Sequence, residues 1–167
     1  WIVPERGSWI EISVTKRDSI AIRIDQGGKI PATTFLRACS PEFSTNEDMI
    51  RVFHDTSEVK LQGADEEPLI GRVVVKDIVD PQKNEKILAS GQRIAKGMLK
   101  LMEEAGLKTV EVITKADDLV ILNTLEEDDT HSHEEALLKI YGRLRPGTPQ
   151  TPDKAKRSTL PRAPPRA

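Results

Sequence analysis

The stretch that decides the fold is residues 9–14, WIEISV, followed after a short interval by residues 20–24, IAIRI. Apolar and polar residues alternate in these stretches, which is the pattern of a β-strand with one buried face. The polar residues 16–19, KRDS, separate them and predict a tight turn. The sequence therefore predicts an antiparallel β-hairpin near the start of the chain.

Helical patterns follow the hairpin. Gly27 and Gly28 lie in a second predicted turn, because glycine adopts positive φ without steric cost. Pro31 then begins a predicted short helix over residues 32–38, and residues 46–53 show helical spacing of their apolar side chains. Strands followed by helices predict an α+β fold.

A capped helix is predicted in the last third of the chain. Ser132 is followed three positions later by Glu135, which is the spacing of a capping box at a helix start. The apolar residues beyond it recur at helical spacing and form one face: Leu137, Ile140, Tyr141 and Leu144.

The middle of the chain predicts a unit of its own. Residues 69–75 and 109–113 have β-strand composition, and residues 91–105 have an amphipathic helical pattern. We interpret this strand–helix–strand unit as an insertion. The predicted organisation is a mixed α+β domain built from residues 1–61 and 118–156, a small inserted α+β unit over residues 62–117, and a tail over residues 157–167 that is disordered or artefactual.

Charge is distributed unevenly along the 167 residues. Residues 1–37 have a net charge of +2, residues 38–153 of −9 and residues 154–167 of +5. A protein that neutralises many phosphates is usually basic throughout, and this chain is not. We expect any nucleic-acid contact to come from local groups in residues 1–37, with a solvated mixed surface as the alternative.

No catalytic or metal-binding set is recognisable in the sequence. The single cysteine, Cys39, excludes an internal disulfide and favours a reducing, intracellular location. The three histidines lack cysteine partners and helical i, i+4 spacing. The longest apolar run, residues 119–122, is far shorter than the roughly 18 residues of a membrane helix. We expect no membrane span and no secretion signal, and Trp1 in place of Met indicates a piece of a longer chain.

Several ordered strings carry a resemblance. They are PERGSWI at residues 4–10, RID at 23–25, KIPATTFLRA at 29–38, EEALLKIY at 134–141 and RLRPGTP at 143–149. In this order they resemble the beta subunit of bacterial DNA-directed RNA polymerase, specifically its lobe domain. The resemblance extends from residue 1 to about residue 156 and includes the middle portion.

The resemblance implies a segment of a multisubunit nucleotidyltransferase that copies DNA into RNA. In this family the lobe forms one wall of the DNA cleft and contacts the nontemplate strand and downstream DNA. The catalytic magnesium is held by the beta-prime subunit, so no catalytic residue and no cofactor is expected here. The implied partners are DNA, the rest of the beta subunit, the beta-prime, alpha and omega subunits and a sigma factor, in the cytoplasm with the nucleoid.

The resemblance also implies site residues. Trp9 occupies the position at which the family contacts an unpaired nontemplate base, and aromatic stacking on a base contributes roughly 1–3 kcal/mol. A ring simply buried at the strand start is the alternative. Arg6 lies in the same loop and is a candidate for a phosphate contact, with a surface ion pair as its alternative.

Two departures from the family pattern stand out. Some relatives have several arginines after Arg-Ile-Asp, whereas this chain has Gln26-Gly27-Gly28, which leaves Lys29 as the candidate for a DNA backbone contact. The resemblance also ends after residue 156, which suggests a reading-frame error or an artificial end, with a basic nucleic-acid-docking tail as the alternative. The competing hypothesis for function is a standalone protein-interaction module that keeps the lobe fold and binds a basic partner.

Overall fold

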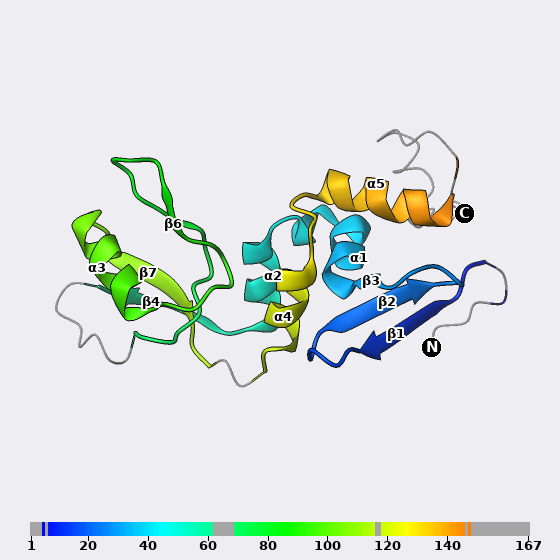
Figure 1. Cartoon of the computed structure of the whole chain (residues 1–167), viewed down its shortest axis with the longest axis horizontal. Helices are drawn as coiled ribbons and strands as arrows, with labels where there is room; N and C mark the ends of the chain where they lie inside the picture. The colour runs from blue at the N-terminus through cyan, green and yellow to red at the C-terminus, as the bar shows by residue number, and fades with distance from the viewer. Residues whose placement is uncertain (1–4, 6, 62–68, 116–117, 146, 148–167) are drawn as a thin grey trace, which may run out of the picture. The chain divides into compact units, whose positions relative to one another are not determined.

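The computed structural model describes residues 5, 7–61, 69–115, 118–145 and 147. Arg6 and the 157–167 tail therefore lie outside the described residues. The chain divides into two compact units, the first made of Trp1–Thr45 with Asn123–Ala167 and the second of Asn46–Leu122. The structure combines helices with small antiparallel sheets, so the predicted α+β class is confirmed (Figure 1).

The first unit is built on a three-stranded antiparallel sheet in the order β1-β2-β3. The predicted hairpin is confirmed, with Ile10 opposite Ile24 and Val14 opposite Ile20. Helices α1 and α5 pack against each other and lie on one side of the sheet (Figure 1). The elements are β1 (Ile10–Val14), β2 (Ile20–Ile24), β3 (Ile30–Pro31), α1 (Ala32–Cys39), the 3-10 turn η1 (Pro41–Phe43) and α5 (His133–Leu144).

Alternation along the strands determines the core of this unit. The isoleucines of β2 and β3 point to the side covered by the helices, where Ile22, Ile24 and Ile30 are buried against α1 and α5 residues such as Leu137 and Ile140. The start of α5 is capped as predicted, since the Ser132 hydroxyl accepts a hydrogen bond from the Glu135 N–H at 3.3 Å.

A buried ion pair joins α1 to the segment before α5. Arg37 Nε donates to Asp128 Oδ2 at 3.2 Å, and these two side chains are 1% and 0% exposed. Thr130 donates to Asp128 Oδ1 through its N–H at 2.9 Å and its hydroxyl at 2.6 Å, and the Thr34 hydroxyl donates at 2.8 Å. Burial by itself would raise the pKa of Asp128, but these hydrogen bonds hold that pKa below its ordinary value.

Helix α4 (Val120–Glu127) secures the hairpin turn. Thr124 Oγ1 accepts from the Ile20 N–H at 2.8 Å, and the buried Ser19 hydroxyl donates to Glu127 Oε2 at 2.8 Å. The Asn123 amide donates to the carbonyl oxygens of residues 17 and 18 at 3.3 and 3.2 Å. These bonds satisfy polar groups of the turn that strand pairing leaves unpaired.

The second unit is organised around two antiparallel strand pairs, β4 with β7 and β5 with β6. Buried apolar side chains of β7 and α3, including Val110, Val112, Leu99 and Met102, form its core. The elements are α2 (Asn46–Phe53), β4 (Thr56–Lys60), β5 (Ile78–Val79), β6 (Lys86–Leu88), α3 (Lys96–Glu104) and β7 (Thr109–Ile113).

Two predictions in the middle of the chain are wrong in detail. Residues 69–75 form no continuous strand, because Gly71 has φ +86° in a turn and only isolated bridges follow, Val73 with Arg93 and Val74 with Val112. The predicted helix over residues 91–105 begins only at Lys96. Gly91 and Ile94 instead donate backbone hydrogen bonds to the carbonyl oxygens of Val74 and Arg72, and the Gln92 carbonyl oxygen accepts from the Val74 N–H, so this stretch pairs with another segment rather than forming a helix.

The compact units differ in extent from the predicted division of the chain. Because β4 pairs with β7 over five residues, residues 46–61 belong to the second compact unit, although the sequence assigned them to the first domain. The predicted domain boundaries, between residues 61 and 62 and between residues 117 and 118, stay a prediction. Within the described ranges, no helix is long and apolar enough to cross a membrane.

Candidate nucleic-acid interface

Trp9 lies directly before β1 and is held by Asp25, which directly follows β2. The Trp9 N–H donates to Asp25 Oδ1 at 3.0 Å, and the Asp25 N–H donates to the Trp9 carbonyl oxygen at 3.0 Å. Asp25 has φ +51°, a left-handed conformation that aspartate tolerates better than most residues. The pair extends the hairpin ladder by one step and places a half-buried Trp9 at the open end of the sheet.

The connection from β2 to β3 brings Lys29 to the same end of the sheet. This connection runs from Asp25, which bonds to Trp9, to Lys29, which directly precedes β3 and is exposed. The structure therefore brings Trp9 and Lys29 to one end of the sheet. Arg6, the third residue predicted for the site, lies outside the described residues.

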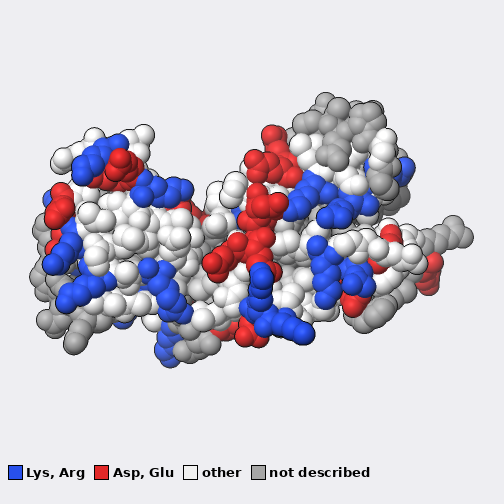
Figure 2. Space-filling view, in the orientation of Figure 1, with Lys and Arg blue, Asp and Glu red and all other residues white. Residues whose placement is uncertain are grey.

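Three further cations of the first unit were missed by the sequence analysis. Arg17 lies in the hairpin turn, Arg23 is on β2, and Arg143 is in the last turn of α5. Arg17 Nη1 lies 3.5 Å from Glu127 Oε1, and Arg23 Nη1 lies 3.7 Å from Glu11 Oε2, so carboxylates partly neutralise these two. Figure 2 shows Lys and Arg side chains over the sheet and over α5.

One signal in the sequence could have found Arg23, and none could have found Arg143. Arg23 stands between two isoleucines in the alternation of β2, so its side chain lies on the side of the sheet opposite the core. Arg143 is separated from the turn at Gly28 by more than a hundred residues. A Cβ placed on Gly28 would nevertheless lie 3.3 Å from Arg143 Nη1.

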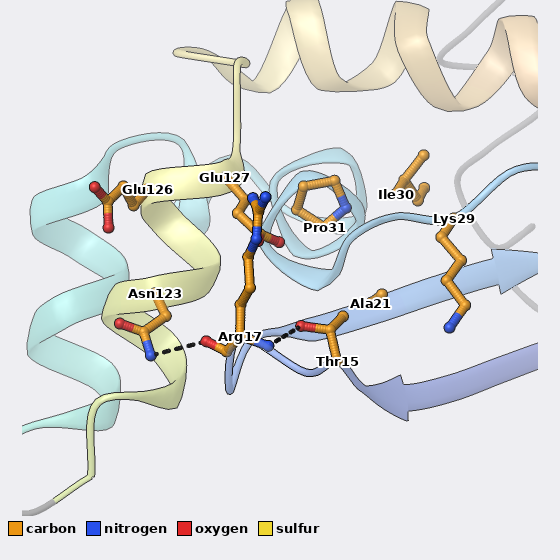
Figure 3. Close-up of a pocket in the computed structure, with 9 residues that line it drawn as sticks. All are labelled: Thr15, Arg17, Ala21, Lys29, Ile30, Pro31, Asn123, Glu126 and Glu127. Atoms are coloured by element: carbon orange, nitrogen blue, oxygen red, sulfur yellow. Dashed lines mark hydrogen bonds and ion pairs between the residues drawn. The ribbon is translucent and has the colours of Figure 1, made fainter.

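An open groove of about 690 Å³ runs between the sheet and α4 (Figure 3). Arg17 reaches across it toward Glu127, while Lys29 lies on the opposite side. The carboxylates of Glu126 and Glu127 line the wall that α4 forms. The groove is therefore mixed in charge, and this wall repels phosphate. Its lining residues are Thr15, Arg17, Ala21, Lys29, Ile30, Pro31, Asn123, Glu126 and Glu127.

The chemistry of these side chains fits binding rather than reaction. The end of the sheet offers an aromatic ring and exposed cations, which suit stacking on bases and contact with phosphates. Within the described ranges, no group of three or more His, Cys, Asp or Glu side chains is arranged to hold a metal ion.

Comparison with known proteins identifies similar chains. The sequence is 42% identical over 160 residues to the DNA-directed RNA polymerase subunit beta of Rhodopirellula baltica. It is 33% identical over 161 residues to the same subunit of Leptospira biflexa and 37% identical over 164 residues to that of Chlamydia muridarum. These matches cover 93%, 93% and 95% of the chain but 13% of each relative, so the chain spans about an eighth of their length. No family model matches the sequence.

Proposed function

Because the chain belongs to the bacterial DNA-directed RNA polymerase beta subunits, of which it spans a segment, we propose that it acts in transcription as the lobe of that subunit. In this role the segment forms one wall of the DNA cleft and contacts the nontemplate strand and downstream DNA. The observation that carries the proposal is the match to beta subunits over 93% of the chain.

The geometry of the first unit supports a contact with single-stranded DNA. Two hydrogen bonds from the Trp9 backbone to Asp25 fix that backbone at the open end of the sheet, so the point from which the ring projects is set before DNA arrives. Stacking on a base is worth roughly 1–3 kcal/mol and tolerates any base. Lys29 lies at the same end of the sheet and supplies a positive charge for a phosphate, and Arg6 is the further candidate for such a contact.

The segment binds DNA in this proposal and does not carry out the nucleotidyl transfer. The catalytic magnesium is held by the beta-prime subunit, and this segment supplies no metal ligand. The segment works in a cytoplasmic, nucleoid-associated assembly with the rest of the beta subunit, the beta-prime, alpha and omega subunits and a sigma factor.

The test is a Trp9→Ala variant in the assembled polymerase, measured on bubble DNA with and without an abasic nontemplate position. For the parent enzyme, removal of the stacked base should weaken binding by about 1–3 kcal/mol. Trp9→Ala should bind intact bubble DNA as weakly as the parent binds abasic DNA, and should be insensitive to the abasic position. Trp9→Phe keeps an aromatic ring and is the matched control.

Equal affinity of Trp9→Ala and the parent across a salt series would contradict the proposal. That result, together with binding of a basic protein by the chain without polymerase subunits, would favour the competing interaction module. The net charge of −9 over residues 38–153 is the feature on which such a partner would act.

A further inference from the structure

Arg23 lies beside Glu11 on the side of the sheet that faces away from the core. The two residues are direct neighbours across β1 and β2, and Arg23 Nη1 lies 3.7 Å from Glu11 Oε2. Ile22 and Ile24, which flank Arg23 on β2, are both buried in the core. Because successive side chains of a strand point to opposite sides, Arg23 and Glu11 project from the other side of the sheet.

Trp9 projects to this same side. Its backbone is held opposite Asp25, so it continues the register of the hairpin by one residue beyond Ile10. Ile10 packs on the core, and alternation therefore places the Trp9 side chain on the side of Arg23. Trp9 and Arg23 are diagonal neighbours across the two strands, a relation in which residues lie about 7–8 Å apart and within reach of long side chains.

The fold leaves the Arg23 guanidinium incompletely bonded. Its Nε is buried and has no hydrogen-bond partner among the described residues. The 3.7 Å contact with Glu11 is longer than a hydrogen bond, so the carboxylate offsets part of the charge without accepting a well-formed bond. The Arg23 side chain is 40% exposed, so a ligand can reach it.

We propose that Arg23 binds the backbone phosphate of the nucleotide whose base stacks on Trp9. This inference rests on the proposed function and adds a residue of the sheet itself to that site. A guanidinium binds two phosphate oxygens at once, which is a stronger contact than the present one with Glu11. The base and the phosphate of one nucleotide are separate groups, so two neighbouring side chains on one side of the sheet can each bind one of them.

The distribution of carboxylates favours this end of the sheet for a phosphate. Glu126 and Glu127 line the groove beside α4, and α4 bonds to the hairpin turn at the other end of β1 and β2 (Figure 3). Neither Trp9 nor Arg23 is among the described residues that line this groove. Glu11 is the described carboxylate that pairs with Arg23, so a phosphate competes there with one carboxylate.

The experiment uses the assembled polymerase with Arg23→Gln in the beta subunit and measures the salt dependence of binding to bubble DNA. The slope of this dependence reports how many phosphates the protein neutralises, at about 0.7 for each phosphate of a single strand. Arg23→Gln should reduce the slope by about this amount, and a slope equal to that of the parent would overturn the proposal. Arg23→Lys retains the charge and should keep most of the slope, whereas an equal loss in both variants would indicate a structural role and would also overturn it.

Arg17→Gln is the matched control. Arg17 also pairs with a carboxylate, since its Nη1 lies 3.5 Å from Glu127 Oε1, but it lies in the hairpin turn at the other end of β1 and β2. This variant should keep the salt slope of the parent. A reduction equal to that of Arg23→Gln would show a general effect of charge and would overturn the site.

Glu11→Gln tests the competition between carboxylate and phosphate for Arg23. This variant should strengthen binding of bubble DNA, because the guanidinium no longer has to leave a carboxylate. The gain should be smaller in the Arg23→Gln background, where only the repulsion between Glu11 and DNA is removed. An equal gain in both backgrounds would contradict a contact through Arg23.

A neutral methylphosphonate linkage in the nontemplate strand locates the phosphate and distinguishes a DNA backbone contact from attraction of free anions. The abasic position to which Trp9→Ala is insensitive identifies the nucleotide. A linkage next to that nucleotide should weaken binding by the parent and leave Arg23→Gln unaffected, and equal sensitivity of the two would overturn the assignment. If Trp9→Ala behaves as proposed while Arg23→Gln keeps the slope of the parent, the phosphate site fails and the proposed function stands.

Discussion

Asp25 binds the backbone of Trp9 at two points. Asp25 Oδ1 accepts from the Trp9 N–H, and the Asp25 N–H donates to the Trp9 carbonyl oxygen, both at 3.0 Å. Asp25 makes these bonds in a left-handed conformation, with φ +51°. The backbone position of Trp9 thus depends on the residue that lies opposite it, beyond the end of β2. Asp25 is a positioning residue for the proposed base contact.

Asp25→Ala should weaken binding of bubble DNA by the assembled polymerase. Alanine removes the acceptor for the Trp9 N–H and also lacks the short polar side chain that lets aspartate tolerate the left-handed conformation, with a combined cost of about 1–2 kcal/mol. Asp25→Asn keeps an oxygen acceptor and tolerates positive φ, so it should bind nearly as the parent does. The loss should disappear in a Trp9→Ala background, and an undiminished loss there would contradict a role through Trp9.

Asp128→Ala should destabilise the first unit by about 3–5 kcal/mol, because it leaves the buried Arg37 guanidinium without its carboxylate. Urea unfolding of the 167-residue chain measures the loss. The double variant Arg37→Met/Asp128→Leu removes both charges and should be less destabilised than Asp128→Ala. If the double variant loses as much unfolding free energy as the single variants Arg37→Met and Asp128→Leu lose together, the two side chains are not energetically coupled.

Stability of the second unit should fall in acid through Glu111. Hydrogen bonds from Arg51 at 3.1 and 3.0 Å, opposed by burial and assisted by Lys76, lower the pKa of Glu111 from 4.5 to about 2. A carboxyl group whose pKa is lower in the folded state stabilises the fold above its unfolded pKa. This contribution is lost as the pH falls from about 4.5 to about 2.

The contribution of Glu111 should be about 1 kcal/mol, because Arg51 and Lys76 are partly exposed and water screens them. Glu111→Gln should lose this amount near pH 7 and should show a flatter dependence of the unfolding free energy on pH below 4.5. Glu104→Gln, on the exposed surface of α3, serves as the control and should keep the acid dependence of the parent. Equal pH profiles for Glu111→Gln and the parent would count against the prediction.

Ser132→Ala should cost about 1 kcal/mol of unfolding free energy, because the Glu135 N–H loses its side-chain acceptor at the start of α5. Ser132→Asp keeps an acceptor at the same position and should retain most of the stability. Thermal unfolding followed by circular dichroism distinguishes the two variants. An alanine variant as stable as the parent would show that the cap contributes nothing.

The hairpin, the helices over residues 32–38 and 46–53 and the cap at Ser132 were predictable, because each follows from spacing within a few residues. Ile10 faces Ile24 since alternation places both on the apolar side of the sheet, and a slip of one residue would expose the whole set. Ser132 and Glu135 meet because they are one helical turn apart. Such features depend on local geometry, which the sequence contains.

The tertiary structure alone decided the rest. Residues 73–75 are rich in valine, yet they form only isolated bridges, because their backbone groups bond partly to residues 91 and 92 and partly to β7. Arg143 reaches Gly28 only because α5 packs on α1 over the sheet. The sequence by itself determined the hairpin, the short helices and the helix cap, because these depend on neighbouring residues, whereas the packing of distant segments determined the bridges at residues 73–74 and the place of Arg143 beside Gly28.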